Sequence, residues 1–342
     1  MDRRDFLKAS GAGVATTVLG AGSISWSPRS EAATISKTYY INDGTVTMPD
    51  GVSVYFKSYG DSATTLHLPA TSIICQEGDT LSITVINRLL TTHNFVIGGL
   101  KAGDPPLAST GDILSGATKT ITYTIPTGKA GSYLFYDNKT TYNRYLGLHG
   151  GLAIMPAGSS TTLYSGSPTF ASNKQLFWIF NDIDPALNNA VRLGGTIPTT
   201  FTPRYFTING LASRPPGATG AGDPTIDAMA DPRTKLSGKV GQRTLLRMLN
   251  AGMCSHSVHT HANHMEWLTN NGTVRSSVWK KDSLYLRNNL GKIDSIFPFS
   301  APPDAYPSVT TGHFPMHLHD EMSQTAGGGL YQFGSMTEIE FL

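Results

Sequence analysis

Cysteine is scarce in this sequence: Cys75 and Cys254 are the only two among 342 residues. A framework of several disulfides and a zinc site made of cysteines are therefore both excluded. In an oxidising compartment the pair could form one disulfide, and two separate buried thiols are the equal alternative.

Long apolar runs and runs of like charge are missing as well. The weakly apolar stretch of residues 9–25 is too short and too rich in glycine, serine and threonine to form a membrane-spanning helix. Lys and Arg number 26 against 24 Asp and Glu, and no run of five like charges occurs, which argues against nucleic acid as a partner. Long amphipathic helices are absent too, since residues 184–192 could form two turns at most.

The N-terminus carries the pattern of an export signal. Residues 2–8 read DRRDFLK and precede the weakly apolar stretch, which ends near the small residues Ala32 and Ala33. This resembles a twin-arginine signal cleaved near Ala32 or Ala33, rather than a basic tail leading into a first helix. We assign residues 1–33 to a cleaved signal and expect a periplasmic or extracellular protein without a membrane partner.

The rest of the chain is predicted to be all-β. Residues 82–86 and 118–125 alternate between apolar and polar, as half-buried strands do, and turn residues flank them. A linker rich in glycine, serine and threonine, residues 157–172, separates this region from new strands at residues 175–180 and 244–250. We therefore expect two β-sandwich domains, residues 34–157 and 173–342.

Six of the ten histidines fall in two short segments. Residues 256–264 read HSVHTHANH, and residues 314–320 read FPMHLHD. Side chains two apart on a strand point to the same face, so each segment presents a pair of imidazoles, His259 with His261 and His317 with His319. If the strands are neighbours, four imidazoles converge. Such a set without a thiolate favours copper, with zinc as the alternative.

Strand parity separates His256 from these pairs. It lies three residues before His259, so on a regular strand it points to the opposite face, as does Leu318. The pattern predicts two sites back to back, one rich in histidine and one around His256.

Motifs in both halves resemble those of multicopper oxidases. Segment 256–261 is similar to the family's His-x-x-His-x-His, and segment 312–319 to its segment ending in His-Cys-His. Segments THNF at 92–95, GSYLFYDN at 131–138 and GLHGGL at 147–152 agree. The resemblance implies two cupredoxin-like Greek-key β-sandwich domains, copper, and an oxidoreductase acting on oxygen or a small substrate. The length is similar to that of the small laccase-like members, which implies a homotrimer with His93 arriving from the next chain.

The departures from that family narrow the expected function. Leu318, Ser323 and Gly328 stand where the type 1 copper takes its Cys, its second His and its axial ligand. Of the eight histidines of the trinuclear cluster, five remain: His259, His261, His317, His319 and His93. Phe95, Tyr136 and Asn138 occupy the other three places. Together with His256, the one matching type 1 position, these histidines are the predicted metal ligands.

We therefore expect an exported, copper-binding, multicopper-oxidase-like protein. If it is active, we expect an oxidoreductase whose copper site lacks the type 1 centre, and no standard laccase activity. A copper storage, delivery or resistance protein without turnover and a copper-free structural protein of the cell envelope are the alternatives.

Several neighbouring residues have two interpretations. His149 could replace a missing ligand or be a hydrogen-bonded loop residue, and His264 could extend the cluster or lie on the surface. Cys254 could supply a soft ligand together with nearby methionines, or these residues could be core filler. Tyr136 could face the metal or pack in the core. Asp320 and Glu321 could orient imidazoles or be ordinary loop charges.

Overall fold

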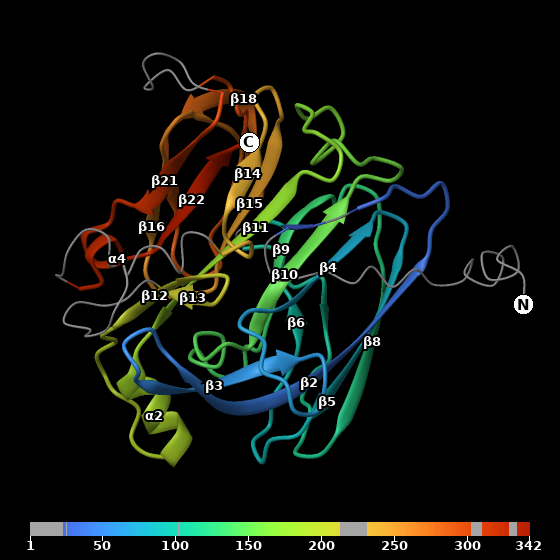
Figure 1. Ribbon diagram of the computed structural model, residues 1–342. Coiled ribbons are helices and arrows are strands. Elements are labelled where there is room, and N and C mark those ends of the chain that lie inside the picture. Colours follow the sequence, from blue (N-terminus) through green and yellow to red (C-terminus); the bar gives the residue numbers. More distant parts are fainter. Residues whose placement is uncertain (1–22, 25, 102, 213–230, 302–309, 328–333) are drawn as a thin grey trace, which may run out of the picture.

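A computed structural model describes residues 23–24, 26–101, 103–212, 231–301, 310–327 and 334–342 (Figure 1). These residues form four β-sheets, and two short helices, α2 (Pro185–Leu193) and α4 (Glu321–Thr325), lie among them. The predicted all-β class is confirmed. Among the described residues, no helix is long and apolar enough to cross a membrane.

The first pair of sheets is built from residues 34–155. One sheet has the order β3-β2-β5-β8 and the other β4-β10-β9-β6-β7. Their strands are β2 (Thr34–Thr47), β3 (Ser53–Gly60), β4 (Ala70–Gln76), β5 (Thr80–Asn87), β6 (Val96–Ile97), β7 (Ala108–Ser109), β8 (Thr118–Thr124), β9 (Gly131–Tyr136) and β10 (His149–Met155). Every second residue of β5 is buried, because one face of that strand packs onto the opposing sheet. The rings of Tyr39, Tyr59, Phe95 and Phe135 fill the centre of this core.

The second pair of sheets is built mostly from residues 175–341. The larger sheet has the order β13-β12-β11-β15-β20-β17-β18, with β1 paired to β11, and the smaller has the order β14-β22-β21-β16-β19. Their strands are β1 (Ser23–Ile24), β11 (Gln175–Ile183), β12 (Tyr205–Ile208), β13 (Leu211–Ala212), β14 (Leu236–Gly238), β15 (Thr244–Asn250), β16 (His256–Thr260), β17 (Met265–Asn270), β18 (Thr273–Lys281), β19 (Ser283–Leu286), β20 (Lys292–Phe297), β21 (Gly312–Leu318) and β22 (Met336–Phe341). The antiparallel pairing of β16 with β21 makes the two histidine segments neighbours.

A shared core joins the two sheet pairs where β9 and β10 face β11 and β15 (Figure 1). Leu163 and Phe170 of the segment between them are buried in this core, so the expected linker is packed rather than extended. The Arg247 side chain, with no exposed surface, donates to Ser132 Oγ at 2.8 Å and to Gln175 Oε1 at 2.9 Å. Apolar packing and a buried polar network therefore hold the two halves together.

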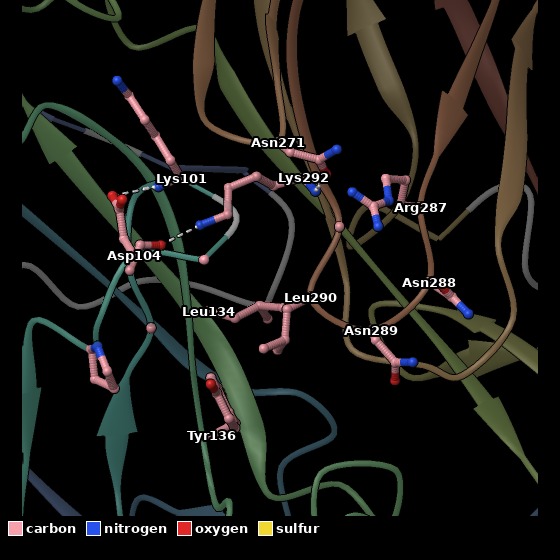
Figure 2. Close-up of a pocket in the computed structure, with 15 residues that line it drawn as sticks. Lys101, Asp104, Leu134, Tyr136, Asn271, Arg287, Asn288, Asn289, Leu290 and Lys292 are labelled. Atoms are coloured by element: carbon pink, nitrogen blue, oxygen red, sulfur yellow. Dashed lines mark hydrogen bonds between the residues drawn. The ribbon is translucent and has the colours of Figure 1, made fainter.

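A second polar interaction links the two halves. The Nζ of Lys292 in β20 donates to Gly99 O of the first half at 2.7 Å, and Figure 2 shows the Lys292 side chain pointing toward the loop that carries Lys101 and Asp104. Burial lowers the pKa of Lys292 to about 8, against the opposing field of Asp294.

The segment that follows the predicted signal core is part of the fold. Trp26 is 2% exposed, its indole donates to Ser159 O at 2.9 Å, and Arg29 is paired with the buried Asp79. Cleavage near Ala32 or Ala33 would remove both contacts. Most of the predicted signal, residues 1–22, lies outside the described residues.

Candidate metal centre

The pairing of two antiparallel strands builds a histidine face. His259 of β16 stands directly opposite His317 of β21. His319 lies just beyond β21 and continues this ladder by donating its backbone N–H to Ser257 O at 2.9 Å. His261 directly follows the last residue of β16. All four imidazoles therefore lie on one face of the smaller sheet, as strand parity predicts.

The four rings form one continuous cluster. Ring centroids are 4.7 Å apart for His259 and His261, 4.5 Å for His259 and His319, and 4.9 Å for His317 and His319. One ring nitrogen from each of His259, His261 and His317 lies within 4.8 Å of the others, and the Nε2 atoms of His261 and His317 are 3.2 Å apart. Two nitrogen ligands of a tetrahedral ion at ~2.0 Å lie roughly 3.3 Å from each other, so the spacing fits metal ligation.

Contacts on the far side of two rings set their tautomers. His317 Nδ1 faces Leu318 O at 3.2 Å, and because a carbonyl only accepts, the proton sits on Nδ1 and the Nε2 lone pair faces the cluster. His259 Nδ1 lies 2.9 Å from Ser283 Oγ and 3.7 Å from the Asp282 carboxylate, which favours the same tautomer. Both rings therefore present a lone pair inward, as metal ligands do.

The electrostatics of the face keep these rings neutral. Burial, together with the fields of the neighbouring imidazoles, lowers the pKa of His317 to about 4. Burial, followed by the fields of His261 and His319, also lowers the pKa of His259. Near neutral pH these two rings are uncharged nitrogen donors, the form that binds a metal cation.

Solvent reaches this face from one side. His259, His261, His264 and Asp282 line a cavity of about 210 Å³, and His264 and His319 are exposed. His264 lies at the rim, and its ring is not among the three with nitrogens in mutual ligand range.

His256 points away from the histidine face into the core of the second sheet pair. It is 1% exposed, and its ring lies 5.4 Å from that of Phe180. Neither ring nitrogen makes a hydrogen bond within the described part of the chain, and Nε2 is 3.4 Å from Oδ1 of the buried Asp182. Leu318, on the same side, is fully buried among apolar residues.

The sulfur atoms near His256 are not arranged as one group. Both cysteines are free thiols, so no disulfide links them, and Cys75 lies in the core of the first sheet pair. Cys254 Sγ is 4.0 Å from Met322 Sδ, whereas Met316 is core filler with no exposed surface. Burial and the nearby Asp182 raise the pKa of the Cys254 thiol. Gly328, the predicted axial position, lies outside the described residues.

His93 and His149 are held within the first sheet pair. The Nδ1 of His93 is 2.5 Å from Asp137 Oδ2 and its Nε2 is 2.9 Å from Thr91 Oγ1. His149 donates from Nδ1 to Arg144 O at 2.8 Å, and burial lowers its pKa to about 4. Within one chain, neither ring belongs to the group of three with nitrogens in ligand range, among the residues that the structure describes.

Asp320 and Tyr136 have structural contacts. Asp320 accepts from the backbone N–H of Ser257, which fixes the start of β16 against the end of β21. Tyr136 is 9% exposed and packs in the core between the two halves, where burial raises its pKa.

Sequence reasoning missed Asp282, Ser283 and Asp182. Asp282 and Ser283 contact His259 only because β19 pairs with β16, and Asp182 reaches His256 from β11. None of them stands next to a histidine in the sequence, so only knowledge of the strand pairing could have identified them.

Two segments of the chain match known protein families. Residues 1–20 match the twin-arginine translocation pathway signal sequence, and residues 62–159 match the family described as multicopper oxidase. A search of curated proteins finds no match.

Solved structures of similar fold include copper enzymes. A blue copper oxidase from Nitrosomonas europaea is 19% identical with a TM-score of 0.66, and 90% of this chain aligns with 86% of that one. The multicopper oxidase mgLAC is 18% identical with a TM-score of 0.65 over the same shares. A copper nitrite reductase from Nitrosomonas europaea is 17% identical with a TM-score of 0.62, over 90% of this chain and 94% of that one. Behind a twin-arginine export signal, the chain therefore carries a multicopper oxidase domain at residues 62–159 within a cupredoxin-like fold.

Proposed function

We propose that this exported protein binds copper on the face formed by His259, His261, His317 and His319. The observation that carries the proposal is the 3.2 Å distance between His261 Nε2 and His317 Nε2. The third imidazole, that of His259, lies next to them and has its Nδ1 hydrogen-bonded to Ser283 Oγ. Four imidazoles without a thiolate suit copper, and zinc is the alternative ion.

The chemistry that follows is that of an oxidoreductase whose copper site is smaller than that of the family and lacks the type 1 centre. Bound copper would supply one-electron redox chemistry toward oxygen or a small substrate. The protein's own part is to hold four imidazole donors and to fix two tautomers through Leu318 O and Ser283 Oγ. The apolar surroundings of Leu318 favour a protein without a type 1 centre, and we expect no intense absorption near 600 nm.

A copper-binding protein without turnover is the second candidate. The exposed His319, and the exposed His264 that lines the cavity beside the face, favour exchange of the ion with solvent, as storage or delivery requires. A copper-free structural role would leave four adjacent imidazoles without a purpose.

His93 and His256 are secondary parts of the proposal. In a homotrimer, His93 of one subunit would approach the histidine face of the next, and its ring would have to give up its bond to Asp137 or Thr91. His256 would ligate a second ion only with Asp182, whose Oδ1 has no hydrogen bond within the described residues.

Metal analysis of the exported protein tests the proposal. We expect at least one equivalent of copper after loading and dialysis, and its loss in His317→Ala. Less than one equivalent in the wild type contradicts both copper-binding functions. If copper binds, oxidation of a phenol or of a metal ion distinguishes the oxidoreductase from the storage protein. His93→Ala and His256→Ala show whether either residue contributes.

A further inference from the structure

A second cavity lies where the two sheet pairs meet, apart from the histidine face. Its volume is about 500 Å³, within the range of pockets that bind small organic molecules. The loop after β9 and the connection between α2 and β12 supply most of its lining, and Met253 and Asn289 complete it. None of its lining residues borders the cavity beside His259.

Arg144 forms a charged part of this lining. Its side chain is buried, with the residue 8% exposed, and it donates from Nε to Ala251 O at 2.7 Å and from Nη2 to Asn289 Oδ1 at 2.8 Å. Both acceptors are neutral, and no carboxylate of the described residues lies within 4 Å to form an ion pair with this guanidinium. Burying a cation that pairs only with neutral groups costs free energy, and a bound anion would offset that cost.

The one carboxylate whose field acts on the pKa of Arg144, Asp182, is already engaged elsewhere. Asp182 exerts a favourable field on Arg144, but its Oδ2 accepts the backbone N–H groups of Met253 and Cys254 at 2.8 and 2.6 Å. Burial accordingly lowers the pKa of Arg144 despite this field. An anion inside the cavity would pair with the guanidinium directly.

The remaining walls are suited to an aromatic ring. The Arg144 guanidinium lies 4.7 Å from the centre of the Tyr145 ring, and the Phe201 ring is 5.9 Å from that of Tyr145. Ile197 and Met253 are 36% and 41% exposed and supply apolar surface. Flat aromatic groups pack well between such side chains.

We propose that this cavity binds a small aromatic carboxylate. The carboxylate accepts hydrogen bonds from the Arg144 guanidinium and from Asn289 Nδ2, which is available because the contacts of this amide to Arg144 and Tyr145 engage its Oδ1. The ring packs against Tyr145 and Phe201. Figure 2 shows Asn289 on the loop that leads to Lys292, so the amide donor comes from the second half and the guanidinium from the first.

Calorimetric titration of the metal-free, mature protein with benzoate tests this proposal. We expect saturable binding of benzoate, with benzyl alcohol and cyclohexanecarboxylate each at least tenfold weaker. Arg144→Gln and Ile197→Glu should each weaken benzoate binding at least tenfold, the first by removing the cation and the second by placing a negative charge in the lining. Arg192→Gln, which removes a charge on neighbouring α2 outside the lining, should leave it unchanged.

Equal affinity for benzoate and benzyl alcohol, or no binding of benzoate, overturns the proposal. If Arg144→Gln fails to fold, Ile197→Glu decides, since its side chain is at the surface: wild-type affinity for benzoate in that variant also overturns the proposal. The titration needs no copper, so its outcome is independent of whether the histidine face binds metal.

Discussion

The hydrogen bond between Ser283 and His259 gives a graded prediction for metal affinity. Ser283→Ala removes the partner of His259 Nδ1, which is 2.9 Å away, while the Asp282 carboxylate remains at 3.7 Å. One lost hydrogen bond is worth about 1 kcal/mol, and the partners that hold the outer nitrogens of ligating histidines typically contribute roughly 10–100-fold in metal affinity. Because Asp282 can still hold the ring, we expect Ser283→Ala to weaken copper binding by about tenfold. We expect the double variant Asp282→Asn, Ser283→Ala to approach a loss of about a hundredfold.

Competition titrations against a chelator of known affinity measure both effects. Ser277→Ala, on the exposed strand β18, is the matched control and should bind copper as the wild type does. Wild-type affinity in the double variant would refute the assignment of His259 as a ligand oriented from its Nδ1 side.

The other predictions concern stability. Arg247→Met leaves Ser132, Gln175 and the buried Asp294 without their cation, and urea unfolding should show a loss of about 3–5 kcal/mol, whereas an unchanged midpoint would contradict the network. A chain that begins at Thr34 lacks the buried Trp26, so it should unfold at a lower temperature and lose about 3 kcal/mol or more of unfolding free energy. N-terminal sequencing that places the start of the mature protein after Trp26 would show that this contact is dispensable. The pKa of His149 is about 4 in the fold and near 6.5 in the unfolded chain, so its contribution to stability is complete above pH 6.5 and falls by about 3 kcal/mol toward pH 4. His149→Gln should flatten that part of the pH profile, and parallel profiles would contradict this cause.

Local sequence patterns predicted the strands well. Residues 244–250 form β15 as expected, and β5 and β8 lie within two residues of the predicted segments at each end. Alternation succeeds for β5 and β8 because each packs one face onto the core, whereas β15 is buried along its whole length. The helix was underestimated slightly: Asp184 caps α2, which continues to Leu193 because Gly194 takes a left-handed conformation.

The grouping of the four histidines could be anticipated, whereas their surroundings could not. Parity fixes which side chains share a face once β16 and β21 are neighbours. The partners on the other side, Asp282 and Asp182, arrive from segments far away in the sequence, and only tertiary packing determines them. The packing of residues 157–172 into the central core was missed for the same reason, since their composition is typical of a linker.

Anomalous diffraction at the copper edge, from crystals of the copper-loaded protein, tests the central claim most directly. We predict an anomalous peak within bonding distance, about 2.0–2.1 Å, of ring nitrogens from His259, His261 and His317, with His319 beside it. Copper found only at Cys254 and Met322, or no ordered copper at the histidine face, would contradict it.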